Sequence, residues 1–411
     1  MANEAQEHTK QTTAAPVTGN ATNSKTRRKR RRGSTTARVL LALLFSVGFF
    51  LSVLPSGRAN IRAALLLPTL LMAAEPAPLT LIDEPVRHTQ MIISASGGPV
   101  YLDVYAPTTP APLIPGTRGG VIMIPGIGDN RKVPQLINLS QALAHAGLVV
   151  MDMTTPTLIS YSLSAQDSDG VVQAFNVLAH WPGVSAKGIG LIGFSGGGPI
   201  ICFAAADPRI RDQVAFIALF GSYFNATSLL RAIGQRALTG RVQPWQPNPF
   251  PLQVLANVIS GTLPPSEGVR LQSAFTPGGK PLTAKDLAQL SPSTAAAYHL
   301  LAGDEPGQAD ANLAALPAQA HALFDELSVN RVIDQIRAPI YLLHDRSDTS
   351  VPFTESRAFA AALARIHHPY DLAEFGIFEH VQVRSDLAVG LLFSDGPRLF
   401  HVLSEVLLAS S

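Results

Sequence analysis

The sequence predicts an α/β fold, a mostly parallel, doubly wound sheet with helices on both faces. Three observations predict it. Short apolar runs alternate with helix-compatible stretches over most of residues 85–410. Several of these runs are apolar throughout, as expected of strands that are buried on both faces of a parallel sheet. One run ends at a glycine-flanked serine, Gly193-Phe194-Ser195-Gly196-Gly197, and a helix-compatible run follows directly.

The remainder of the domain is organised around this serine. The apolar run 189–193 predicts a strand and the run up to about Ala206 predicts a helix, which places Ser195 at the apex of the turn between them. Gly193 and Gly197 would relieve the crowding at such an apex. The pentapeptide fits G-x-S-x-G, the nucleophile elbow, in which the serine hydroxyl is exposed above the edge of the sheet. Glycine-rich loops beside serines are common, so the interpretation depends on a base and an acid further along the chain.

The composition limits the possible classes of protein. The chain has 411 residues, of which 46% are hydrophobic and 15% charged, and its formal net charge is +2. This length suggests one large domain or two smaller ones, and the apolar balance suggests a membrane segment. The single cysteine, Cys202, excludes an intrachain disulfide and a Cys-rich metal site. Residues 193–198 lack the lysine of a phosphate-binding loop, and we expect no cofactor and no metal.

The N-terminal part predicts a disordered, basic cytoplasmic tail over 1–36 and a membrane anchor with an apolar linker over 37–75. Residues 39–57 are uncharged, enough at roughly 1.5 Å per residue to cross the hydrocarbon of a bilayer. The basic run 27–32 precedes this span, which favours a cytoplasmic N-terminus and an extracytoplasmic catalytic domain. The alternatives are a nuclear-localisation or nucleic-acid patch at 27–32, secretion after signal cleavage, and a two-pass hairpin. The remainder of the chain gives no indication of a nucleic-acid surface.

Residues 76–411 predict the catalytic domain. We expect strands over 90–94, 100–105, 120–124, 148–153, 189–193, 213–220 and 370–375, with one more within 338–344. We expect helices over 136–146, 169–179, 355–365 and 397–408. The pattern breaks at 222–330, where helical pieces alternate with proline-rich stretches that carry few ionisable residues. We interpret 222–330 as a lid-like insertion that shapes an apolar substrate pocket; a structural ornament and an attachment surface are the alternatives.

A base and an acid do follow Ser195. The acidic loop His344-Asp345-Arg346-Ser347-Asp348, followed by Val351-Pro352, comes after a later strand, and His380 comes after the last strand. With this order and the elbow, the chain resembles the α/β-hydrolase family over roughly residues 85–410, with the insertion less typical. The resemblance implies Ser195 as nucleophile, His380 as general base and Asp348 as the acid that orients it. Asp345 stands where the family usually has glycine and is the competing acid.

Acyl transfer also needs N–H groups that face the developing oxyanion. The glycine-rich loop after residues 120–124 could supply the N–H of Ile127, and the residue after the nucleophile could supply the N–H of Gly196. The family's usual His-Gly start of this loop is replaced here by Ile124-Pro125-Gly126. An ordinary strand-to-helix turn is the alternative interpretation of the loop.

These observations predict a membrane-anchored serine hydrolase that cleaves a small carboxylic ester with an apolar part through an acyl-enzyme. The fold class resembles dienelactone-hydrolase-like enzymes, but Ser195 stands in place of the cysteine of that branch. A peptidase or an acyltransferase could use the same triad, and a non-catalytic binding protein on this fold is a further alternative. The sequence indicates neither the natural ester nor the oligomeric state.

Overall fold

The computed structural model describes residues 38–42, 54–72, 85–108, 118–238, 243–384 and 389–411. The chain divides into two units, 1–51 and 52–411. Residues 38–42 of the first unit are helical, and every element below belongs to the second. The predicted tail and residues 43–53 of the predicted anchor lie outside the described residues. Within those described ranges, no helix is both long enough and apolar enough to span a bilayer.

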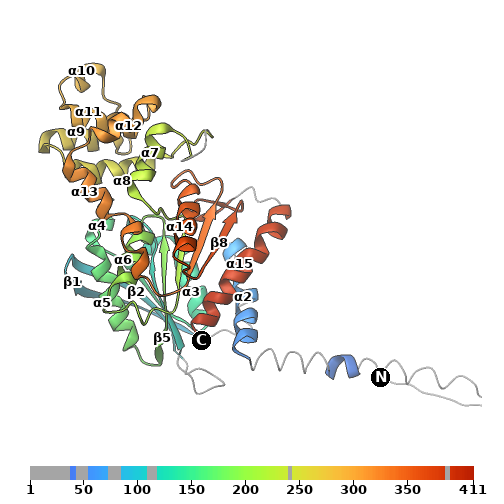
Figure 1. Ribbon diagram of the computed structural model, residues 1–411. Helices are drawn as coiled ribbons and strands as arrows, with labels where there is room; N and C mark the ends of the chain where they lie inside the picture. Colours follow the sequence, from blue (N-terminus) through green and yellow to red (C-terminus); the bar gives the residue numbers. More distant parts are fainter. Residues whose placement is uncertain (1–37, 43–53, 73–84, 109–117, 239–242, 385–388) are drawn as a thin grey trace, which may run out of the picture. The chain divides into compact units, whose positions relative to one another are not determined.

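The centre of the second unit is an eight-stranded sheet with the order β1-β2-β4-β3-β5-β6-β7-β8 (Figure 1). β2 pairs antiparallel with β1 and β4, and the pairs from β4 to β8 are parallel. The strands are β1 (Val86–Ala95), β2 (Gly98–Pro107), β3 (Arg118–Ile124), β4 (Val149–Thr154), β5 (Val184–Phe194), β6 (Ile217–Phe220), β7 (Ile340–Asp345) and β8 (Tyr370–Phe375). The predicted α/β fold with a mostly parallel sheet is confirmed.

One predicted strand is shorter than expected. The apolar pattern predicted a strand over 213–220, but β6 begins at Ile217. The N–H of Gln213 donates to the carbonyl of Ile210 at 2.8 Å, so this residue closes a turn instead of pairing with a neighbouring strand. Periodicity does not register the end of this turn, because Val214, Ala215 and Phe216 after it are as apolar as the strand itself.

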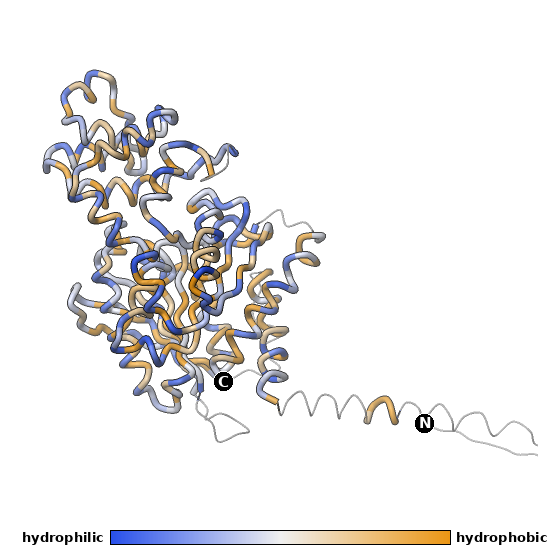
Figure 2. The backbone as a smooth tube through the Cα atoms, in the orientation of Figure 1, coloured by the Kyte–Doolittle hydropathy of each residue, from blue (hydrophilic) through white to orange (hydrophobic). Residues whose placement is uncertain are grey.

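Helices cover both faces of the sheet (Figure 1), as the doubly wound pattern predicts. One face packs against α2 (Pro55–Met72), α3 (Pro134–His145) and α15 (Val389–Ala409). The other packs against α5 (Asp167–Ala179), α6 (Gly197–Ala206) and α14 (Thr354–Arg365). Figure 2 shows that the strands between these layers are mostly hydrophobic. Their burial supplies the apolar core on which the sheet edge with the site rests.

Two helices differ from the sequence-based expectations at their prolines. The apolar stretch after the predicted anchor is part of α2, whose Ala63 and Leu66 are fully buried. α2 begins at Pro55, a position where the missing N–H has no effect on the helix. The closing helix was expected to begin at Pro397, but α15 begins at Val389 and continues through that proline.

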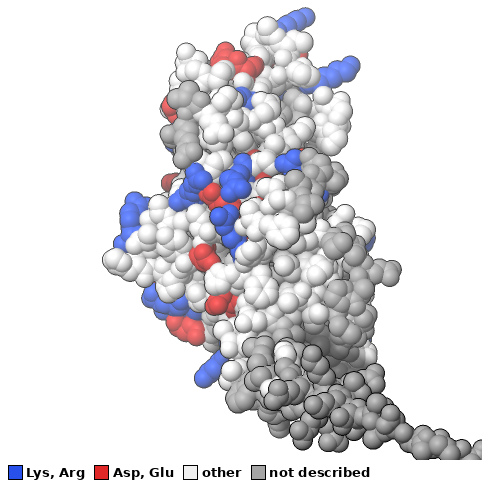
Figure 3. All heavy atoms as spheres, turned by 90° about the vertical axis from the view of Figure 1, so that its right-hand side faces the viewer, with Lys and Arg blue, Asp and Glu red and all other residues white. Residues whose placement is uncertain are grey.

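The segment between β6 and β7 is largely helical and lies beyond the carboxyl ends of the strands (Figure 1). Its helices are α7 (Ala226–Gln235), α8 (Pro249–Ser260), α9 (Pro265–Phe275), α10 (Ala284–Leu287), α11 (Pro292–Ala302), α12 (Ala309–Ala314) and α13 (Ala318–Glu326). The short elements are α4 (Pro156–Ile159), η2 (Asn130–Lys132), η3 (Pro306–Gln308), η4 (Val329–Arg331), η5 (Ile333–Gln335), β9 (Phe378–Glu379) and β10 (Gln382–Val383). Acidic and basic side chains mix on the face in Figure 3, among mostly neutral described atoms.

Candidate active site

Ser195 lies at a strained turn between β5 and α6. Its φ is 51°, in the left-handed region that residues other than glycine seldom adopt. The Ser195 N–H donates to the carbonyl of Phe220 in β6 at 2.8 Å, and the Ser195 carbonyl accepts from the N–H of Gly198 at 3.1 Å. Backbone strain of this kind persists where surrounding contacts hold it, and it is common at active sites.

The glycines on both sides of Ser195 are required by close approaches of the backbone. A Cβ on Gly193 would lie 2.6 Å from the Cα of Gly198. A Cβ on Gly197 would lie 2.6 Å from Cγ2 of Ile124. The G-x-S-x-G spacing therefore has a physical reason in this chain: the helix can begin directly above the strand only when both positions lack a side chain.

Asp348 and His380 form a hydrogen-bonded pair. The His380 Nδ1 lies 2.7 Å from Oδ2 of Asp348. Oδ1 of Asp348 accepts from the N–H groups of Ser350 at 2.7 Å and Val351 at 3.0 Å. Oδ2 also lies 3.2 Å from Nε2 of His344. Because Nδ1 of His380 is committed to the carboxylate, Nε2 is the nitrogen that can exchange a proton with a serine.

The surroundings of Asp348 keep it ionised although its side chain is fully buried. Burial alone would raise the pKa of this carboxyl, but attraction to His380, with hydrogen bonds to His344 and His380, holds its pKa well below the usual range. A carboxylate that stays negative next to Nδ1 fixes the tautomer of His380 and stabilises the imidazolium form.

His380 occupies the turn between β9 and β10, with a φ of 57°. Gly221, which follows β6, connects this turn to the elbow. A Cβ on Gly221 would lie 3.0 Å from Nδ1 of His380 and 3.2 Å from Oδ2 of Asp348. The preceding residue, Phe220, accepts the hydrogen bond from the N–H of Ser195. The ends of β5 and β6 thus place Ser195 and the Asp348–His380 pair at the same edge of the sheet.

The strand order and the strand-turn-helix geometry at Ser195 identify the fold. The chain has the α/β-hydrolase fold. The mostly parallel sheet matches the expectation from the sequence.

Asp345, the competing acid in the loop after β7, points elsewhere. Its Oδ1 accepts from the N–H of Ser347 at 2.8 Å and from the hydroxyl of Ser347 at 2.6 Å. Its Oδ2 accepts from the N–H of Phe378 at 2.8 Å. Asp345 is therefore an acceptor that ties the end of β7 to the start of the hairpin that carries His380.

The two residues predicted to supply oxyanion N–H groups lie against each other. A Cβ on Gly196 would lie 2.6 Å from Cδ1 of Ile127, so the Ile127 side chain covers Gly196. Asn130 donates through Nδ2 to the carbonyls of Pro125 and Ile127, both at 3.0 Å, which shapes the loop. Across the described ranges, neither the N–H of Ile127 nor that of Gly196 donates to another residue. Both donors remain available to a ligand.

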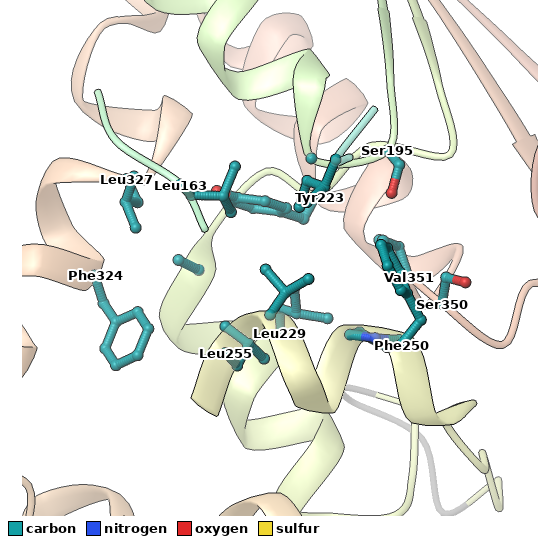
Figure 4. A pocket seen from close by; sticks show the side chains of 15 residues that line it. Leu163, Ser195, Tyr223, Leu229, Phe250, Leu255, Phe324, Leu327, Ser350 and Val351 are labelled. Carbon is teal, nitrogen blue, oxygen red and sulfur yellow. The ribbon is translucent and has the colours of Figure 1, made fainter. Parts of the chain in front are cut away.

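A pocket opens beside Ser195 (Figure 4). Residues of α7, α8 and α13 form much of its wall, so the segment between β6 and β7 contributes directly to it. The described lining carries no ionisable Asp, Glu, Lys, Arg or His side chain and is almost entirely apolar. It consists of Ile127, Leu163, Ser195, Gly196, Tyr223, Ala226, Leu229, Phe250, Pro251, Val254, Leu255, Phe324, Leu327, Ser350 and Val351.

Two residues that the sequence did not single out attach the insertion to the acid loop. Nε1 of Trp245 donates to the carbonyl of Asp348 at 2.7 Å. Asn248 donates through Nδ2 to the hydroxyl of Ser350 at 2.7 Å, and its N–H donates to the carbonyl of Thr349 at 2.9 Å. Both lie in the proline-rich stretch 244–251, whose composition gave no sign of these contacts.

Neither a family model nor a curated protein sequence matches the chain. Solved structures with a similar fold include a dipeptidyl peptidase 4 from Porphyromonas gingivalis, at 14% identity and a TM-score of 0.44 over 78% of this chain and 35% of that one. A puromycin-hydrolyzing peptidase from Mycobacterium tuberculosis is 17% identical, with a TM-score of 0.46 over 78% of this chain and 38% of that one. A lipase/esterase from Lactobacillus plantarum is 13% identical, with a TM-score of 0.44 over 78% of this chain and 99% of that one. The chain spans about a third of the first of these proteins.

Proposed function

We propose that the protein is a serine hydrolase that cleaves carboxylic esters with an apolar acyl group. The observation that carries the proposal is the Asp348–His380 pair, joined at 2.7 Å and held beside the end of β6 to which the N–H of Ser195 is bonded. A serine hydroxyl becomes an effective nucleophile when an imidazole accepts its proton and a carboxylate orients that imidazole.

In the proposed reaction, Nε2 of His380 accepts the proton of the Ser195 hydroxyl while Oγ attacks the ester carbonyl. The N–H groups of Ile127 and Gly196 would donate to the oxyanion of the tetrahedral intermediate. His380 then gives the proton to the departing alcohol and leaves an acyl-enzyme on Ser195. Water, deprotonated by His380, hydrolyses this intermediate and releases the acid.

The lining of the pocket supports an ester with an apolar acyl group as the substrate. An apolar acyl chain binds favourably against an apolar wall, because its surface is removed from water. A free ammonium group would be buried there without a counter-charge, which is unfavourable. A peptidase that binds a free amino terminus would need an acidic side chain at that position, and the described lining offers none. A peptidase without this requirement and an acyltransferase use the same triad and are outcomes of the test.

The test compares turnover of p-nitrophenyl esters of increasing acyl length with turnover of aminoacyl and acyl-peptide p-nitroanilides. Wild type and Ser195→Ala are assayed side by side, with folding checked by circular dichroism. We expect ester hydrolysis that rises with acyl length, is lost in the variant, and exceeds amide hydrolysis. Faster cleavage of the anilides would favour a peptidase. Ester turnover that persists in Ser195→Ala would overturn the proposal.

We further propose that the chain is anchored in a membrane by the apolar span within 37–75, with residues 1–36 in the cytoplasm and the catalytic domain on the other side. The support is the uncharged span 39–57 next to the basic run 27–32. The test is carbonate extraction of membranes from expressing cells, followed by protease treatment of sealed vesicles and blotting for tags at both ends. A washed-off protein that lacks the N-terminal tag would favour secretion after cleavage.

A further inference from the structure

The pocket beside Ser195 contains a buried polar group that the proposed mechanism does not use, the phenol hydroxyl of Tyr223. Tyr223 is only 3% exposed and lines the pocket. Its hydroxyl has no hydrogen-bond partner among the described residues. Figure 4 shows the ring of Tyr223 along the wall of the pocket, with its oxygen at the end away from Ser195. Folded proteins seldom keep a buried hydroxyl unpaired, because burying it without a partner is unfavourable.

The position of Tyr223 is fixed by the backbone that follows it. Glu355, at the start of α14, accepts through Oε2 from the N–H groups of Phe224 at 3.0 Å and Asn225 at 2.9 Å. Its Oε1 accepts from the hydroxyl of Ser228 at 2.5 Å. The chain next to Tyr223 is therefore tied to α14, which limits how far Tyr223 can move to find a partner elsewhere.

The hydroxyl is suited to act as a hydrogen-bond donor. Burial raises the pKa of Tyr223 above its ordinary value, and the nearby Glu355 and Cys202 add to this effect, so the phenol stays neutral. The other hydroxyls of the wall have assigned partners or roles: Ser350 accepts from Asn248, and Ser195 is the proposed nucleophile. Tyr223 thus carries a hydroxyl without a partner among the described residues in a mostly apolar wall, an arrangement that selects for one matching atom on a ligand.

We propose that the Tyr223 hydroxyl donates a hydrogen bond to an oxygen carried on the acyl chain of the substrate. The preferred substrates are then esters of oxygen-substituted acids, with a hydroxyl, ketone or ether oxygen along the chain, over esters of plain alkanoic acids. This inference rests on the proposed ester hydrolysis at Ser195. A site built around a hydrogen bond discriminates against the analogue that lacks the bonding atom.

The test uses p-nitrophenyl hexanoate and its analogues in which an ether oxygen replaces one methylene, at each position from the γ-carbon outward. Each kcat/KM is divided by the rate constant for hydrolysis by hydroxide, which corrects for intrinsic reactivity. In the wild type we expect one analogue to exceed hexanoate by about 2- to 12-fold, the range for one net hydrogen bond. Tyr223→Phe should abolish this preference, so that kcat/KM falls more for the favoured analogue than for hexanoate.

Tyr161→Phe is the matched control, because Tyr161 is 42% exposed and does not line the pocket. It should keep the wild-type preference. The melting temperature of Tyr223→Phe without substrate should equal or exceed that of the wild type, since the variant removes only an unpaired hydroxyl. Equal corrected rates for all analogues in the wild type, or a preference that survives in Tyr223→Phe, would overturn the inference. Absence of all ester turnover would instead refute the proposed function.

Discussion

Replacing Asp348 and Asp345 in turn separates the two candidate acids of the loop. In Asp348→Asn, the amide that faces His380 would donate to Nδ1, because the remaining side-chain oxygen faces the N–H groups of Ser350 and Val351. The proton of the neutral imidazole would then sit on Nε2, which could no longer accept the serine proton. The same change in a serine protease triad lowers kcat by about 10⁴-fold, and we expect a loss of that size here.

Asp345→Asn has a different consequence, because this carboxylate touches Ser347 and Phe378 but not His380. The amide that replaces the carboxylate can accept hydrogen bonds on only one side, so one buried N–H loses its partner. This loss should lower the free energy of unfolding by about 1–3 kcal/mol. We expect kcat to fall by less than about tenfold, since only the support of the His380 hairpin is weakened.

The assay measures kcat for a p-nitrophenyl ester and the urea midpoint of unfolding for both variants. Asp348→Asn should lose activity far more than stability, and Asp345→Asn the reverse. A larger loss of kcat in a folded Asp345→Asn than in Asp348→Asn would refute the assignment of the acid.

Three other changes have expected outcomes of their own. Gly193→Ala should lose both soluble expression and esterase activity, because the new Cβ would lie 2.6 Å from helix backbone that cannot yield. Trp245→Phe removes the hydrogen bond to the carbonyl of Asp348 and should lower the free energy of unfolding by about 1 kcal/mol and raise KM, as steady-state kinetics can show. Burial raises the pKa of Asp152 from 3.8 to about 8. The stability that the neutral carboxyl contributes to the folded state is therefore fully present below about pH 4, and it is lost as the pH rises through about 8. Urea titrations at several pH values should show that the free energy of unfolding of the wild type falls by up to about 1.4 kcal/mol per pH unit within that window. Asp152→Asn should remove this pH dependence.

The sequence was sufficient for the parts of the fold that follow from local patterns. The elbow could be located because its G-x-S-x-G pattern is local: Gly193 is crowded by Gly198, and Gly197 is crowded by Ile124 of β3. Most strands were predicted because continuous apolar runs report burial on both faces. The same patterns failed at Gln213 and Pro397, where a turn and a continuing helix were not visible in periodicity.

Contacts between distant segments could not be predicted. Motif spacing left Asp345 and Asp348 as competing acids, and only the path of the loop after β7 shows which carboxylate faces His380. Trp245 reaches the carbonyl of Asp348 across 103 positions of sequence. Tyr223 belongs to no motif, so its position in the apolar wall of the pocket could not be predicted from the sequence. Such contacts depend on how the insertion folds over the sheet, which no single stretch encodes.

The most direct test of the account is the mass of the intact protein after reaction with a fluorophosphonate, with peptide mapping of the adduct. The account predicts a single adduct on Ser195 in the wild type and none in Ser195→Ala. It also predicts much slower labelling of His380→Ala, because the serine would lose its base. An adduct on another residue, or an unlabelled wild-type protein that is folded, would contradict the claim that Ser195, His380 and Asp348 act together.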